Sequence, residues 1–152
     1  MEKHLSDTEF TSAAAELPPY RLEDQIGFKL RLANQRHLEI FARHIDGLTP
    51  TQFAVMAKLS DSGEVSQNRL GRMAGMDAAT TKGVVDRLAR RDLVRTRPSE
   101  TDKRRLLVFL TPQGRALIEE AVTEARIVTE ETLRPLTGTE RTRLLELLGK
   151  LA

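Results

Sequence analysis

The sequence predicts a mainly α-helical fold with one small β-wing, and three observations lead to this prediction. Apolar residues recur at helical spacing on both sides of residues 93–111, the stretch that contains two short strand patterns. Within Val65–Arg115, a short helix, a turn and a second helix precede these strands, which a charged loop joins. This stretch holds 12 basic and 5 acidic residues, a net charge of +7 in a chain whose total is +2. The order is that of a winged helix-turn-helix, and the concentrated charge is typical of a nucleic-acid-binding module.

The bulk composition excludes several classes of protein and site. The 152 residues suit one compact domain or a small domain with an extension. The chain has no cysteine, which removes disulfides, thiol nucleophiles and cysteine-based zinc sites. There is no apolar run of about 18 residues and no long apolar core at the N-terminus, so we expect a cytoplasmic protein without a membrane helix. Because no phosphate loop, H-E-x-x-H helix or G-x-S-x-G elbow occurs, we expect neither an enzyme nor a cofactor.

The two ends of the chain are expected to form a helical dimerisation region, residues 20–46 and 112–152, around a DNA-binding domain, residues 47–111. Residues 1–19 are expected to form a flexible arm, which ends at two prolines that forbid a helix. A helical pattern from Leu22 to Ile45 has apolar residues on more than one side, so a second subunit is a candidate cover. The last helix carries five leucines, which pack either within the chain or against a partner chain.

Capping signals mark where the other helices begin. Thr49 and Gln52 form a capping box with proline at the first helical position, Asp77 is an N-cap, and Thr137 with Glu140 repeats the capping box. The expected elements are helices at residues 49–61, 66–73, 77–91, 112–133 and from 137 onward, and strands at 93–98 and 106–111.

The candidate DNA contacts come from both parts of the winged module. The N-terminal part of its second helix should enter the major groove, where small side chains allow close approach and hydroxyl or ammonium groups reach the bases. Guanidinium groups of the wing suit the narrow minor groove. The candidates are Ala78, Thr80, Thr81, Lys82 and Arg87 on the second helix, Arg97, Lys103, Arg104 and Arg105 at the wing, and Ser66, Gln67, Asn68 and Arg72 as phosphate contacts. A plain helix surface and a solvated charged loop are the alternatives.

Two histidines, His37 and His44, lie seven residues apart on the long front helix and therefore nearly on one face, which is otherwise apolar. Imidazoles there can donate to a carboxylate or a pyridine-like ring without permanent buried charges. Arg21, Gln35 and Arg43 are neighbouring candidates for carboxylate recognition. The alternative is that both histidines are core residues bonded to backbone carbonyls. A zinc site is disfavoured, since only three histidines exist and carboxylates would have to complete it.

The order of elements from Tyr20 onward resembles the MarR family of bacterial transcription regulators. The wing carries the most specific match, because Asp102-Lys103-Arg104, the strand Leu106–Leu110 and then Thr111-Pro112-Gln113-Gly114 follow the family's D-x-R, strand, L-T-x-x-G pattern. The resemblance implies a nucleoid-associated protein in which Arg104 inserts into the minor groove and Asp102 orients it through a charge-assisted bond. Asp92 stands where the family commonly has glycine, so a less left-handed turn is expected there.

The front half is also similar to one branch of this family, the repressors of nicotinate catabolism. The similar segments are Tyr20–Phe28, Gln35–His37 and Thr49–Phe53. The resemblance implies that an aromatic acid, for example a hydroxynicotinate, sits between the dimerising helices and the DNA-binding part. We therefore expect a dimeric repressor that binds a pseudo-palindromic operator with two modules about 34 Å apart and is released by such an acid. An architectural DNA-binding protein without a ligand, or a protein-interaction module that uses the basic patch, is the alternative.

Overall fold

The computed structural model describes residues 17–152. Most of the expected flexible arm, residues 1–19, lies outside this range, and the described part, Leu17–Pro19, has no helix or strand. The elements in chain order are the 3-10 helix η1 (Leu22–Asp24), α1 (Ile26–His44), α2 (Pro50–Ser62), β1 (Val65–Ser66), α3 (Gln67–Ala74), α4 (Ala78–Arg90), β2 (Val94–Pro98), β3 (Leu106–Leu110), α5 (Pro112–Leu133) and α6 (Gly138–Gly149).

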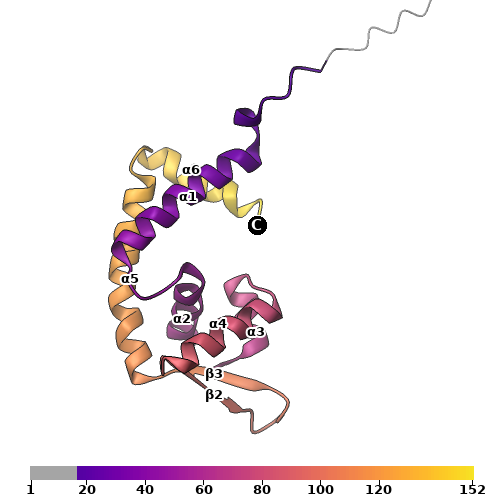
Figure 1. Cartoon of the computed structure of the whole chain (residues 1–152), viewed down its shortest axis with the longest axis vertical. Helices are drawn as coiled ribbons and strands as arrows, with labels where there is room; N and C mark the ends of the chain where they lie inside the picture. The colour runs from indigo at the N-terminus through magenta and orange to yellow at the C-terminus, as the bar shows by residue number, and fades with distance from the viewer. Residues whose placement is uncertain (1–16) are drawn as a thin grey trace, which may run out of the picture.

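The long helix α5 joins two regions of the molecule. One end of α5 lies beside α1 and leads into α6, and the other end packs against α2 and β3 (Figure 1). The expected fold class, mainly α with a winged helix-turn-helix, is therefore confirmed. The wing has one strand more than expected, since the two-residue β1 pairs antiparallel with β3 and gives the strand order β1-β3-β2.

The buried core lies mainly in the DNA-binding part and continues between α1 and α5. Its fully buried side chains are Val55, Met56, Leu59, Leu70, Val85, Leu88, Leu93, Val94, Val108 and Ile118. Phe41 of α1 and Phe53 of α2 pack edge to face with ring centroids 6.0 Å apart, which ties the two regions together.

The expected helix caps are all present. Thr49 and Gln52 form the complete capping box of α2, and Thr137 with Glu140 forms that of α6. The Asp77 side chain accepts from the Thr80 amide at the start of α4. One boundary was wrong: α1 begins at Ile26 rather than Leu22, because Gln25 is extended with φ −83° and ψ 138° and interrupts the helical pattern.

The turn between α4 and the wing corrects another expectation. Asp92 adopts φ 55°, so the turn is left-handed although glycine is absent. Aspartate tolerates this region better than most residues, because its short polar side chain bonds locally. Here the carboxylate lies 3.1 Å from the Arg95 guanidinium, and the Asp92 carbonyl accepts the Thr111 hydroxyl at 2.6 Å. The turn is thereby fixed to the start of α5.

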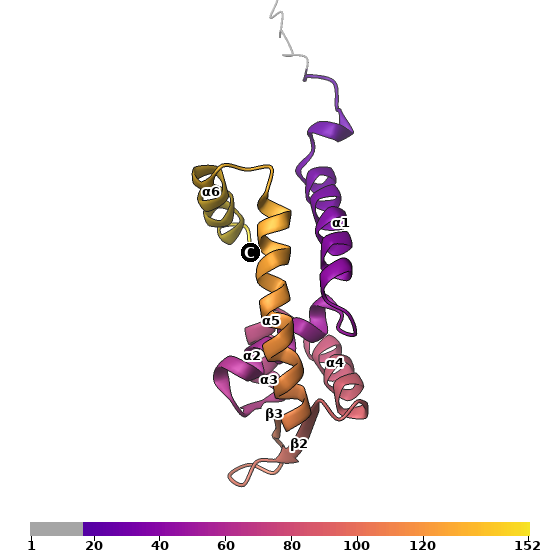
Figure 2. The same ribbon diagram turned by 90° about the vertical axis from the view of Figure 1, so that its left-hand side faces the viewer.

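Helix α6 stands apart from the core. In Figure 2, α6 and α1 appear on either side of the carboxyl half of α5, and side chains of all three helices line one open cavity. None of the residues of α6 is buried. Leu145 and Leu151 are 57% and 72% exposed. Within residues 17–152, we find no helix with the length and apolarity needed to cross a membrane.

Candidate nucleic-acid interface

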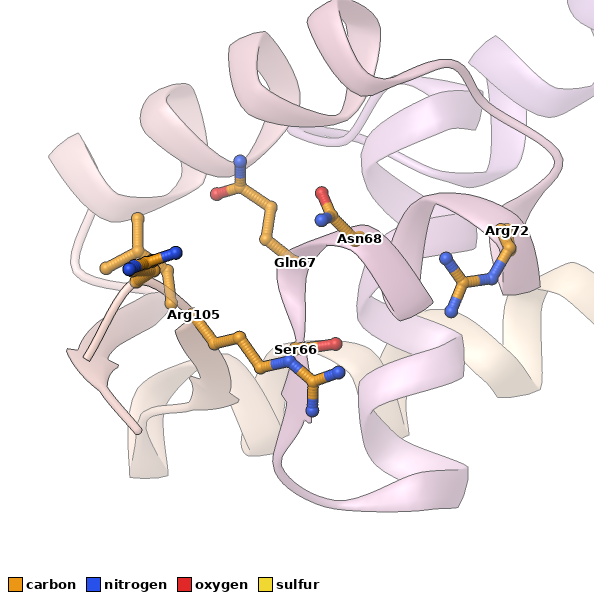
Figure 3. A pocket seen from close by; sticks show the side chains of 7 residues that line it. Ser66, Gln67, Asn68, Arg72 and Arg105 are labelled. Atoms are coloured by element: carbon orange, nitrogen blue, oxygen red, sulfur yellow. The ribbon is translucent and has the colours of Figure 1, made fainter. Parts of the chain in front are cut away.

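A polar and cationic hollow lies between α3 and the wing. It has a volume of about 190 Å³. Its lining consists of Ser66, Gln67, Asn68, Arg72, Arg104, Arg105 and Leu106. Figure 3 shows the α3 side chains and Arg105 around this one hollow. Six of the residues proposed from the sequence are thus brought together, in a composition that suits a phosphate group.

The first turn of α3 borders this hollow. Ser66 ends β1 and caps α3, where its hydroxyl accepts from the Arg69 amide at 3.3 Å. The amides of Gln67 and Asn68 fall in the first turn, which has no helical acceptors for them. Their position and the positive end of the helix dipole favour an anion there.

The N-terminal part of α4 is open to solvent along one face. Ala78, Thr80, Lys82 and Arg87 are exposed on it. The Asp77 carboxylate accepts from the Thr80 amide at 2.7 Å, and these hydrogen bonds to Thr80 lower the pKa of Asp77. A second hollow of about 340 Å³ lies between α3 and α4. This face has the small and polar side chains that a major-groove helix needs.

Thr81 departs from the expectation of a base contact. Its side chain is 1% exposed, and its hydroxyl donates to the Asp77 carbonyl at 2.7 Å. A Cβ on Gly71 would lie 2.6 Å from the Thr81 hydroxyl oxygen, so α3 and α4 meet closely at this point. Thr81 therefore holds the two helices together, and its neighbours Thr80 and Lys82 present polar groups to solvent.

The wing loop is held by Asp102, in a different way from the one expected. The Asp102 carboxylate accepts from the backbone amide of Arg104 at 3.1 Å and lies 4.0 Å from the Arg105 guanidinium. It therefore orients the backbone of Arg104 rather than its guanidinium. The Ser99 amide donates to the Arg105 carbonyl at 2.8 Å and closes the loop. Lys103 and Arg104 are exposed at its tip.

Arg97 does not lie at the wing tip. It sits on β2 opposite Leu107, where its Nε donates to Glu64 Oε2 at 2.8 Å and its Nη2 to Glu64 Oε1 at 2.6 Å. The hydrogen bonds from Arg97 hold the pKa of Glu64 below its usual value. Glu64 was missed by the sequence reasoning, because a separation of 33 positions between the two partners leaves no local pattern.

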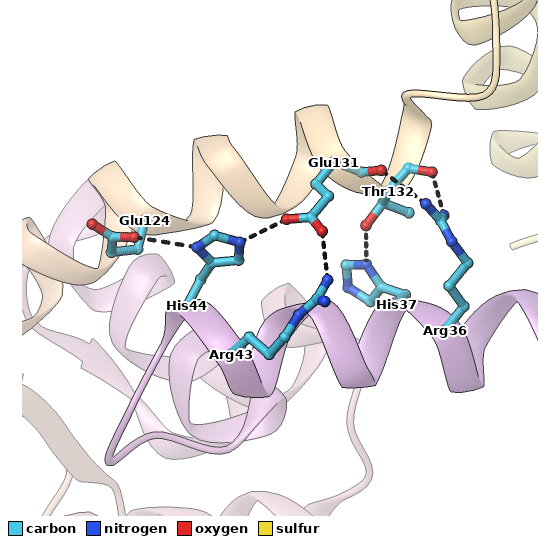
Figure 4. A network of polar contacts seen from close by, with 7 residues as sticks. All are labelled: Arg36, His37, Arg43, His44, Glu124, Glu131 and Thr132. Carbon is cyan, nitrogen blue, oxygen red and sulfur yellow. Dashed lines mark hydrogen bonds and ion pairs between the residues drawn. The ribbon is translucent and has the colours of Figure 1, made fainter.

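The five candidate ligand-binding residues do not form one site. Arg21 is exposed and pairs with Asp24 at 3.9 Å, and Gln35 is exposed on α1. Figure 4 shows the other three within a network between α1 and α5. Arg43 contacts Glu131, and His44 Nε2 donates to the same carboxylate at 2.7 Å. The hydrogen bond from His44 is the main cause, and the charge of Arg43 a further cause, of a lowered pKa of Glu131.

His37 is the candidate that faces cavities. Its Nδ1 lies 2.9 Å from the Thr132 hydroxyl. One cavity of about 230 Å³ is lined by His37, Phe41, Pro50, Phe53, Ala125, Val128 and Thr129 of α1, α2 and α5. A larger, more apolar cavity of about 370 Å³ lies on its other side, between α1, α5 and α6. Phe41 and Phe53 were identified from the sequence only as apolar residues, since helical spacing does not separate a cavity wall from a core.

No cluster of His, Asp and Glu side chains in residues 17–152 is arranged to hold a metal ion. In the described part of the chain the polar chemistry is therefore concentrated in two places. One is the cationic surface of α3, α4 and the wing, and the other is the network around His37 and Glu131.

A helix-turn-helix whose open face continues into a cationic wing defines a winged-helix transcriptional regulator. The MarR family model matches residues 48–106. The transcriptional repressor NicR of Pseudomonas putida is 37% identical over 143 residues, which cover 93% of this chain and 90% of NicR. The chain belongs to the MarR family.

Two solved structures extend the similarity to the whole described fold. A probable transcriptional regulator from Pseudomonas aeruginosa is 49% identical, with a TM-score of 0.83 over 87% of this chain and 100% of that one. BpsR of Bordetella bronchiseptica, whose DNA binding is regulated by 6-hydroxynicotinic acid, is 40% identical. Its TM-score is 0.85 over 88% of this chain and 97% of BpsR.

Proposed function

We propose that this MarR-family regulator is a homodimeric repressor that binds a pseudo-palindromic operator and is released by a small aromatic acid of the hydroxynicotinate type. The observation that carries the proposal is the hollow in which the α3 residues and the wing arginines meet. A duplex that lay against this surface would place a phosphate there and bring α4 to the major groove.

The DNA contacts follow from which side chains are exposed. Ala78, Thr80 and Lys82 face the major groove, Arg87 reaches its edge, and Arg104 with Lys103 enters the minor groove. Ser66, Gln67, Asn68, Arg72 and Arg105 hold phosphates around the hollow.

The dimer is supported by the apolar surface at the end of the molecule opposite the wing. Ile26, Leu30 and Leu32 of α1 are 63%, 44% and 44% exposed, and α6 buries none of its residues. Such a patch rarely stays in water on a soluble protein. A second copy that covers it would set the two winged modules at the spacing of a palindrome.

The effector site is proposed at the smaller cavity beside His37. Two aromatic rings, Phe41 and Phe53, suit a flat ring, and His37 and Thr129 supply polar groups. BpsR, which is similar over most of this chain, responds to 6-hydroxynicotinic acid. The cavity touches α1 and α5 on one side and α2 on the other, so a ligand that prefers one arrangement of these helices shifts the DNA-binding parts.

A binding titration tests the DNA part of the proposal. Fluorescence anisotropy is measured on a labelled duplex from the region around the gene, with a scrambled duplex as competitor. A repressor should prefer its operator by about 1,000-fold or more. An architectural protein would bind both duplexes alike, and a protein-interaction module would bind neither at about 50 mM salt.

A thermal-shift series tests the effector part. We expect 6-hydroxynicotinate to raise the melting temperature of the wild-type protein by mass action. His37→Ala should lose the shift. His44→Ala is the matched control and should keep it, because His44 is engaged with Glu131 and lines neither cavity. An equal shift in wild type and His37→Ala would remove the pocket assignment.

A further inference from the structure

We propose that Glu64 and Arg97 form a brace that sets the position of the wing relative to the helix-turn-helix. Both are then positioning residues for DNA binding, and Arg97 does not contact DNA itself. This inference rests on the proposed DNA-binding function and concerns how the wing is held in position for it. Arg97 was expected from the sequence to be a groove contact, and the structure assigns it another partner.

The brace spans the whole three-stranded sheet. Glu64 directly precedes β1, and Arg97 lies on β2, with the central strand β3 between them. Ser66 and Arg97 are both register partners of Leu107. The two hydrogen bonds, at 2.8 and 2.6 Å, are the parallel bidentate pair that fixes a guanidinium in both distance and orientation.

The wing has few other ties in this direction. β1 is two residues long, and the residues of β2 after Val94 are all exposed, so the outer part of the hairpin has little core of its own. The base of the hairpin, at Val94, Val108 and Leu110, is buried in the core. The hollow that would take a phosphate is lined by Ser66, two residues after Glu64, and by Arg104 of the wing, so its shape depends on the register that the brace holds.

An electrostatic role and a positioning role of Glu64 predict opposite effects of its removal on DNA affinity. Its carboxylate lies at the edge of a cationic DNA-facing surface, so simple electrostatics predicts tighter DNA binding when the charge is removed. The brace predicts weaker binding, because the wing loses its fixed position. Glu100 is a matched control in the same wing: it is 90% exposed and lies 3.8 Å from Arg97 Nη1.

The test compares Glu64→Gln, Arg97→Gln, the double variant and Glu100→Gln on one duplex at several salt concentrations. We expect either brace variant to weaken binding about 3- to 5-fold, the scale of an exposed ion pair. The double variant should be no weaker than the single ones, because both break the same contact. Glu100→Gln should bind as well as wild type or more tightly.

The dependence of binding on salt separates positioning from contact. A lost phosphate contact lowers the slope of log K against log salt by about 0.9, whereas a lost positioning residue leaves the slope unchanged. A reduced slope in Arg97→Gln overturns the inference. Wild-type or tighter binding by Glu64→Gln overturns it as well. A charge swap, Glu64→Arg with Arg97→Glu, should recover binding relative to either single reversal.

A second measurement needs no DNA. Amide hydrogen exchange along β2 and at Ser99 should accelerate in Glu64→Gln and stay at the wild-type rate in Glu100→Gln, with melting temperatures as the check on folding. If the wild-type protein bound no duplex, the proposed function would fail. The hydrogen-exchange rates alone would then show whether Glu64 and Arg97 hold the wing. Unchanged exchange in Glu64→Gln shows that the brace does not hold the wing.

Discussion

Gly114 has no space for a side chain. A Cβ built on it would lie 1.9 Å from the Leu93 carbonyl oxygen and 2.9 Å from the carbonyl carbon. Both neighbours are backbone at the start of the wing, so neither can rotate away as a flexible side chain could. This glycine lets the first turn of α5 lie directly on the strand that leads out of the turn after α4.

We expect Gly114→Ala to destabilise the fold by about 3 kcal/mol or more, since the helix must shift away from the wing. The control is Gly27→Ala in α1, where no atom lies within 4 Å of the added Cβ. Removing a glycine from an exposed helix there should stabilise by about 0.5–1 kcal/mol. Urea denaturation of both variants makes the comparison, and equal stabilities would contradict the close approach.

The neighbours Thr80 and Thr81 should separate DNA binding from stability. Thr80→Ala keeps the backbone amide that Asp77 caps and removes an exposed hydroxyl, so it should weaken operator binding and leave stability within about 0.5 kcal/mol. Thr81→Ala removes a buried hydrogen bond and a methyl group between α3 and α4, and should cost about 1–3 kcal/mol. Operator titration and thermal melts of both variants measure this, and a reversed pattern would contradict the assignment.

At the scale of single residues, the sequence predicted interactions between near neighbours in the chain and missed interactions between residues far apart in it. Thr49, Asp77 and Thr137 act as caps because each cap oxygen and the backbone amide that donates to it lie three residues apart, a distance that sequence reasoning covers. The burial of Thr81 depends on how α3 crosses α4, and the partner of Arg97 depends on sheet register. Neither can be obtained from spacing along the chain.

The α1–α5 contact is held by polar groups at its carboxyl half. Arg36 donates to the Thr132 and Glu131 carbonyls at 2.7 and 3.0 Å, near the last turn of α5. This contact satisfies carbonyls that have few helical partners and places a cation at the negative end of the helix. The Glu131 side chain contacts Arg43 and His44, which both lie about two turns further along α1 than Arg36 (Figure 4).

The Glu131 carboxylate should make this contact sensitive to acid. Its pKa is lowered by the His44 hydrogen bond and by Arg43, so the folded state binds the proton more weakly than the unfolded state does. The resulting stabilisation is present above the usual value of 4.5 and is lost as the pH falls below it. Melting temperatures should therefore fall less steeply between about pH 5 and 3 in Glu131→Gln. Glu39 is an exposed carboxylate of α1 outside this network, so the melting temperature of Glu39→Gln should depend on pH as that of wild type does. The same pH dependence in Glu131→Gln would show that this contact contributes nothing to stability.

Sequence periodicity predicted most helices and failed where an element is short or interrupted. The pattern from Leu22 continues in phase through η1 and α1, so the extended Gln25 between them leaves no sign in it. β1 has two residues, too few to show the alternation of apolar and polar residues that marks a strand. It is a strand because it pairs with β3. The left-handed Asp92 follows from the bond of its carbonyl to Thr111, which is formed only when α5 returns to the wing.

At the scale of the whole molecule, the stretch Val65–Arg115, which contains α3, α4 and the wing, carries 12 of the 24 basic residues and a net charge of +7. The oligomeric state could not be predicted in this way, because no pattern in one sequence distinguishes a leucine that packs against a second subunit from one that packs within its own chain. In the structure, Leu144, Leu145 and Leu148 line an open cavity and no residue of α6 is buried, which leaves these leucines accessible for the proposed dimer contact.

Leu145→Glu should therefore disrupt the proposed dimer. A carboxylate in the apolar contact would have to lose its hydration, so we expect the dissociation constant of the dimer to rise at least about 10-fold. Operator affinity should fall with it, because two half-sites are no longer read together. Sedimentation velocity at several concentrations measures the first effect. Lys150→Glu places the same group at the residue that caps the end of α6 and should stay dimeric. Equal behaviour of the two variants would contradict the interface.

The 22 residues of α5 form one uninterrupted rod about 33 Å long, which is fastened at both extremities. Thr132 ties one extremity to α1, and Gly114 presses the other onto the root of the wing. A tilt of about 5° at the first would sweep the second through about 3 Å, as far as a hydrogen bond reaches. In the proposed mechanism α5 would act as a lever, because a small shift of its end beside His37 would move the wing out of register with the double helix.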